Sequence, residues 1–149
     1  MKVCRNALLG LIVAALLLAP IVSAQNSEKN TVLVIKPGYN DTQTGMSVRS
    51  IDWITQGETD YFSKYVSSGI TQLVVDLNWG TSSNTLSLTI NSPTGQYCPY
   101  YDSSDGITDG RTVLRITKSG GQTLPSGTWS FRIYGERVTG NEDYTFVTY

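Results

Sequence analysis

The chain has 149 residues, with 11 basic and 12 acidic side chains, a formal net charge of −1 and no histidine. This length fits one domain with a single core. The balanced charge and the lack of a long basic run argue against nucleic acid as a partner. The absence of histidine removes the commonest general base and the commonest metal ligand.

Residues 1–24 are predicted to be a cleaved signal peptide. Lys2 and Arg5 form a basic start, an apolar run follows over residues 7–22, and small residues at 22–24 form a cleavage site. We expect cleavage before Gln25, and therefore a secreted, extracellular or cell-surface protein without membrane contact after cleavage. The alternative is a retained membrane helix, but the run is shorter than the ~20 residues that a bilayer requires.

The same cleavage would change the cysteine chemistry of the chain. It would remove Cys4 and leave Cys98 as the remaining cysteine. Because Cys98 lies between Tyr97 and Pro99-Tyr100, we expect it to be a packed, unreactive thiol, and the alternative is a disulfide to another chain.

The region after the signal peptide is predicted to contain a leader, a strand and a loop. Residues 25–30 are polar and predict a short flexible leader. Residues 31–36 are apolar and β-branched and end at a Pro-Gly pair, which predicts the first strand. Residues 39–47 are expected to form a loop, in which Asn40 begins an acceptor triplet for N-glycosylation.

From residue 47 onward, apolar and polar residues alternate in short runs separated by turn-forming residues. Such alternation predicts strands with one face on a core, and we expect Leu88, Trp129 and Phe131 to be core residues. Several short strands at this spacing predict an all-β fold, an antiparallel jelly-roll-like β-sandwich that forms one domain over residues 31–149.

Five segments occur in a characteristic order: GETDYF at 57–62, LVVDLNW at 73–79, LSLTI and PTG within 86–95, GTWSFRIYG at 127–135, and DYTF at 143–146. In this order they resemble the bacterial and archaeal prepeptidase C-terminal (PPC) domain family. The resemblance implies a small jelly-roll sandwich that accompanies secreted peptidases without supplying catalysis. Because the predicted signal peptide leads almost directly into the sandwich, we expect a free-standing domain.

The residues themselves do not indicate an enzyme. Without histidine, a Ser-His-Asp or Cys-His device is excluded, and no Ser-x-x-Lys pattern is present. Carboxylate pairs exist, but a chain with 12 acidic residues contains such pairs by chance. We therefore expect no catalytic residues.

Residues 102–110 form the most acidic loop of the chain, with Asp102, Asp105 and Asp109 among serines and glycines. Calcium binds six to eight oxygen atoms from loops of this composition, and some members of the resembled family bind calcium. The sequence therefore predicts a calcium site at these three residues. The alternative is turn formation, because Asp-Gly pairs favour tight turns.

Three tyrosines, Tyr97, Tyr100 and Tyr101, precede this loop and predict a ligand-binding patch for a sugar or a peptide. The expected function is a non-catalytic module that binds an extracellular polymer, a protein partner or an envelope component. The alternative is a structural subunit of an extracellular layer or filament, in which residues 31–35 are donated to the sheet of a neighbouring copy.

Overall fold

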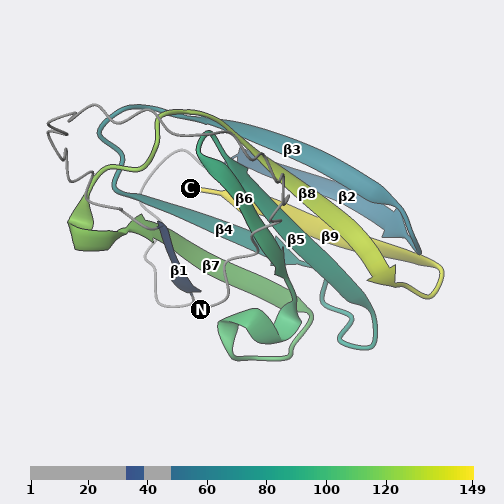
Figure 1. Ribbon diagram of the computed structural model, residues 1–149. Coiled ribbons are helices and arrows are strands. Elements are labelled where there is room, and N and C mark those ends of the chain that lie inside the picture. The colour runs from purple at the N-terminus through teal and green to yellow at the C-terminus, as the bar shows by residue number, and fades with distance from the viewer. Residues whose placement is uncertain (1–32, 39–47) are drawn as a thin grey trace, which may run out of the picture.

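The computed structural model describes residues 33–38 and 48–149, which form two antiparallel sheets (Figure 1). The five-stranded sheet contains, in spatial order, β1 (Leu33–Pro37), β7 (Arg111–Lys118), β4 (Gln72–Asn78), β9 (Asn141–Thr148) and β2 (Val48–Thr55). The four-stranded sheet contains β3 (Thr59–Val66), β8 (Gly127–Arg137), β5 (Thr85–Ser92) and β6 (Gly95–Tyr100). Two short 3-10 turns, η1 (Asp102–Asp105) and η2 (Ser119–Gly121), lie before and after β7. The predicted all-β sandwich is confirmed.

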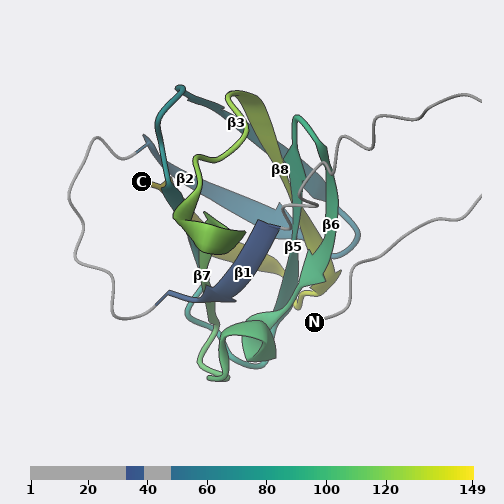
Figure 2. The ribbon, with the colours of Figure 1, turned by 60° about the vertical axis from the view of Figure 1, so that its left-hand side comes forward.

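The core lies between the two sheets, which face each other in Figure 2. The three predicted core residues Leu88, Trp129 and Phe131 are each 0 % exposed, so this prediction is confirmed. Phe62 of β3 stacks on Phe146 of β9 with ring centroids 5.0 Å apart, which joins the two sheets. The alternating residues of β5 and β8 therefore form one wall of the core, as period-two patterning requires.

The central strand β4 departs from the predicted one-sided pattern, because residues from both of its faces are buried. Leu73, Val75 and Leu77 belong to the core cluster. Val74 and Asp76, whose side chains alternate with these, are also buried. Alternation predicts which residues share a face of the strand. It does not predict whether other residues cover the face that points away from the core.

The first strand, β1, pairs with β7 of its own chain, with Ile35 opposite Ile116. Pro37 is the last residue of β1. A strand that ends in proline at a sheet edge is a common arrangement, since proline has no N–H to donate to a neighbour. The segment expected to be donated to another copy is thus, from Leu33 onward, part of its own sheet.

The consecutive strands β2 and β3 lie in different sheets, and each is an edge strand. The turn between them contains Gly57, whose φ of 80° falls in the left-handed region that glycine adopts without strain. The Gly57 N–H donates to the Gly135 carbonyl at 2.9 Å, which fixes the turn against β8. The chain therefore crosses from one sheet to the other at one side of the sandwich.

Several expectations fall outside the described residues. These are the signal peptide with its cleavage site, the leader at 25–30 and the Asn40 triplet. Cys98 of β6 is partly buried and disulfide-bonded. The expectation of a packed thiol concerns the chain after cleavage, and it stays a prediction. None of the helical segments within residues 33–38 and 48–149 is long and apolar enough to cross a bilayer.

Candidate binding surfaces

The acidic loop, residues 102–110, is organised around the side chain of Asp102. This carboxylate is 8 % exposed and accepts hydrogen bonds from the backbone N–H groups of Asp109, Gly110 and Arg111 at 3.1 to 3.3 Å. Buried backbone donors require acceptors, and a charged acceptor forms the stronger bonds. Asp102 therefore closes the loop on itself and sets the start of β7.

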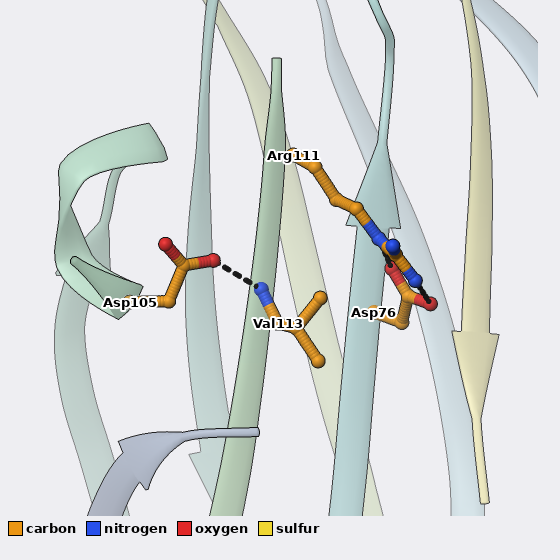
Figure 3. Close-up of polar contacts among 4 residues, drawn as sticks. All are labelled: Asp76, Asp105, Arg111 and Val113. Atoms are coloured by element: carbon orange, nitrogen blue, oxygen red, sulfur yellow. Dashed lines mark hydrogen bonds and ion pairs between the residues drawn. The ribbon is translucent and has the colours of Figure 1, made fainter. Parts of the chain in front are cut away.

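Asp105 connects the same loop to β7 at a second point. Its Oδ2 atom accepts from the Val113 N–H at 2.7 Å, as Figure 3 shows, and its Oδ1 atom accepts from the Ile107 N–H at 3.1 Å. Figure 3 also shows the neighbouring ion pair, in which Arg111 donates from Nε and from one terminal nitrogen to the two Asp76 oxygens at 2.8 and 2.6 Å. This bidentate pair ties β7 to β4.

The third acidic residue, Asp109, is exposed, unlike Asp102 and Asp105. Within residues 33–38 and 48–149, no group of three or more acidic or cysteine side chains is arranged to hold a metal ion. The hydrogen bonds of Asp102 and Asp105 support the turn interpretation of this loop. The calcium site at the three aspartates stays a prediction.

The three predicted ligand-binding tyrosines do not share one environment. Tyr97 and Tyr100 are partly buried and pack against the core, opposite Ile90 and Leu88 of β5. Burial is the main cause of a raised pKa for the Tyr100 hydroxyl. Only Tyr101 is exposed, at 39 %. Two of the three rings therefore present much of their surface to the core instead of to a ligand.

A different surface, which sequence reasoning missed, lies on β2 and β9. Ile51 and Trp53 are 72 % and 66 % exposed although both are large and apolar. Their register partners on β9 are Thr145 and Asp143, and Thr145 in turn faces Asn78 of β4. We call these five residues, together with Asp52, the β2–β9 surface.

The β2–β9 surface contains two adjacent depressions. The first has a volume of about 180 Å³ and is lined by Ile51, Asp52, Trp53 and Asp143. The second has a volume of about 200 Å³, and its lining includes Ile51, Asn78, Asp143 and Thr145. Because Ile51 and Asp143 line both depressions, the two lie side by side on the outer face of the five-stranded sheet.

The free edge of β2 next to this surface is capped by carboxylates. The Trp53 N–H donates to Oδ1 of Asp52 at 2.9 Å, and the Thr55 N–H donates to Oε2 of Glu58 at 2.8 Å. The Glu58 oxygen also accepts from the Thr55 hydroxyl. The backbone hydrogen bond is the main cause of a lowered pKa for Glu58. These caps occupy donors that an added strand would otherwise use.

The sequence does contain a signal for the β2–β9 surface. In residues 51–54 the apolar side chains occupy both phases of the strand, with Ile51 and Trp53 on one face and Ile54 on the other. Only Ile54 is buried, at 0 % exposure. When an edge strand has apolar residues on both faces, the core covers one face and the other stays exposed to a ligand.

Comparison with known proteins adds no relative. No family model matches the chain, and no curated protein matches it.

Proposed function

We propose that this chain is a non-catalytic secreted or cell-surface module of the jelly-roll type, similar to the prepeptidase C-terminal domain, and that it binds an extracellular polymer or partner through the β2–β9 surface. The observation that carries the proposal is the exposure of Ile51 and Trp53 around a depression lined by Asp143. Large apolar side chains gathered with polar neighbours are typical of interaction sites.

The composition supports a binding role over a catalytic one. The chain has no histidine, so acid–base chemistry near neutral pH would require carboxylates or lysines with displaced pKa values. Burial lowers the pKa of Lys64, but its ammonium group donates to the Thr148 carbonyl and so serves as a structural donor between the sheets. The carboxylates of the acidic loop serve as acceptors for backbone amides.

Two observations disfavour the alternative of a subunit assembled by strand pairing. The β1 strand, which would be donated, pairs with β7 of its own chain. At the opposite edge of the same sheet, the Trp53 and Thr55 N–H groups are capped by Asp52 and Glu58. Size-exclusion chromatography of the purified protein is expected to give a monomer. A polymer would favour the subunit instead.

The test is retention of the purified full chain on polymers and proteins from its native culture medium and cell envelope. The double variant Ile51→Ser, Trp53→Ala is expected to lose retention by about tenfold or more, equivalent to 1.4 kcal/mol or more of binding free energy. The matched control is Tyr61→Ala, Tyr65→Ala, which removes two rings of 71 % and 69 % exposure from β3 in the other sheet. Equal retention of the two double variants, or turnover of peptidase, esterase or glycosidase substrates, would contradict the proposal.

A further inference from the structure

The two depressions of the β2–β9 surface are open to solvent and lie next to each other. Their volumes, about 180 and 200 Å³, are nearly equal, and each is smaller than the roughly 300–1,000 Å³ of a pocket that encloses a whole small-molecule ligand. Each depression therefore offers a contact face for one unit of a larger ligand and does not enclose a whole ligand. Because they share Ile51 and Asp143 as walls, a ligand with two successive similar units would fill both.

The first depression combines a flat apolar face with hydrogen-bond acceptors. The Trp53 indole is 66 % exposed, and its register partner across the strand pair is Asp143. The negative face of an aromatic ring attracts polarised C–H groups, such as those on the face of a pyranose ring. A carboxylate beside that ring accepts charge-assisted hydrogen bonds from hydroxyl groups. This combination matches a sugar ring stacked on Trp53.

The second depression contains both donors and acceptors. Ile51, Thr145 and Asn78 are register partners in one row across β2, β9 and β4. The Asn78 amide both donates and accepts, and the Thr145 hydroxyl does the same. A ligand unit with several hydroxyl groups satisfies such a lining better than a single charged side chain does.

The charge of the described lining disfavours anionic polymers. Among the described residues that line the two depressions none is basic, whereas Asp52 and Asp143 are acidic. Arg111 follows Asn78 in the same row of the sheet, but its guanidinium is held by the Asp76 carboxylate at 2.6 Å. Polymers that carry carboxylates, sulfates or phosphates would therefore meet repulsion at this surface.

A peptide that extends the sheet is disfavoured at the same place. Strand addition depends on free backbone N–H groups along the edge, and those of Trp53 and Thr55 already donate to Asp52 and Glu58. An incoming strand would have to displace both carboxylates. Recognition through the face of the sheet does not disturb these caps.

We propose that the β2–β9 surface binds a neutral polysaccharide, with one pyranose ring stacked on Trp53 beside Asp143 and the next ring beside Asn78 and Thr145. This inference rests on the proposed function and names the class of polymer that the module takes.

The experiment measures depletion of the full chain from solution by insoluble polymers. The probes are a panel of neutral polysaccharides (cellulose, chitin, starch and mannan), the anionic polysaccharide alginate, and an oligolysine peptide on beads. We expect retention on at least one neutral polysaccharide and none on alginate. Trp53→Ala should weaken retention at least tenfold. Asn78→Ala should weaken it about threefold to tenfold, because the loss of one hydrogen bond lowers affinity by about that much.

Two control variants separate the site from general surface effects. Tyr65→Ala removes an exposed ring from β3, and Asp109→Asn removes a negative charge from the acidic loop. Both are expected to retain wild-type binding. Thermal melts of all variants should coincide with the wild type within a few degrees, since the substituted residues of the surface are exposed.

Four outcomes would overturn the inference. Retention on none of the neutral polysaccharides contradicts it, as does equal retention of the wild type and Trp53→Ala. Retention on oligolysine alone, lost in Trp53→Ala, would identify a basic protein segment as the partner; the proposed binding function would then stand while the polysaccharide inference fails. If the Ile51→Ser, Trp53→Ala variant also keeps its retention on native material, both fail.

Discussion

At the start of β7, the buried carboxylate of Asp102 accepts hydrogen bonds from the backbone. Three consecutive N–H groups, from Asp109 to Arg111, converge on its oxygens. All three hydrogen bonds can form together only when the loop is closed. These hydrogen bonds give the Asp102 carboxylate a structural role in the loop.

We predict that Asp102→Ala lowers the free energy of unfolding by about 3 kcal/mol. The reason is that several backbone donors lose a charged acceptor, and each such loss costs about 1–3 kcal/mol before the loop relaxes. Chemical denaturation of the full chain measures the change. Asp109→Ala, at an exposed position of the same loop, should cost less than about 1 kcal/mol. Equal costs for the two variants would contradict the role assigned to Asp102.

Thermal melts of the full chain test for calcium binding. If the Asp102 and Asp105 oxygens serve backbone amides, thermal melts with millimolar calcium and with chelator should superimpose. A bound ion at a hundredfold excess over its Kd would add about 2.7 kcal/mol and shift the melting temperature by several degrees. A shift of that size that disappeared in Asp105→Asn, Asp109→Asn would establish the calcium site and overturn the turn interpretation.

Among the elements, the connection into β7 depends on a close approach of two backbone segments. The Gly110 carbonyl accepts from the N–H groups of Trp79 and Gly80, both at 2.9 Å. A Cβ atom on Gly110 would lie 2.7 Å from the Gly80 carbonyl carbon, and its φ of 81° is in the left-handed region. Both conditions select glycine at this position.

We predict that Gly110→Ala destabilises the fold more than Gly106→Ala does. Gly106 has a φ of 95° but nothing within 4 Å of an added Cβ, so alanine there costs only the left-handed conformation, about 1–2 kcal/mol. At Gly110 the overlap should add a further 1–3 kcal/mol. Denaturant melts of the two variants measure the difference. Equal stabilities would mean that the two segments separate at little cost.

The sequence predicts the strands more accurately than it predicts which of their faces are buried. The alternation in β5 and β8 correctly identified the inward residues, but only β8 has the predicted one-sided burial, because Ser87 and Thr89 on the second face of β5 are also buried. In β4 the same reasoning missed the burial of Val74 and Asp76. In β2 it missed Trp53, since alternation cannot reveal that a strand lies at an edge. Composition also favoured Tyr97 and Tyr100, whose rings turned out to pack against the core.

At the scale of the whole molecule, processing and disulfide chemistry are linked. The sequence contains two cysteines, Cys4 and Cys98. The predicted cleavage before Gln25 would remove Cys4. A chain processed in this way would hold Cys98 as a free thiol or pair it with another molecule.

We predict that the secreted protein begins at Gln25 or within two residues of it, and that Cys98 reacts with an alkylating reagent after unfolding. Amino-terminal sequencing and the intact mass before and after alkylation provide the measurement. Secretion of a product that begins with Met1 would contradict the cleavage. A peptide map in which residue 4 is covalently linked to residue 98 would do the same.

The order of strands in the five-stranded sheet has a kinetic consequence. Val48 of β2 pairs with Thr148 of β9, and β9 also separates β2 from β4. The β2–β9 surface therefore forms only when two segments from distant parts of the chain have met, and such non-local pairings slow folding. Until β2 pairs with β9, Ile51 and Trp53 belong to an unpaired, apolar strand. Asp52 lies between them in the sequence, and a charge within an apolar strand is a feature that opposes aggregation of unfolded chains.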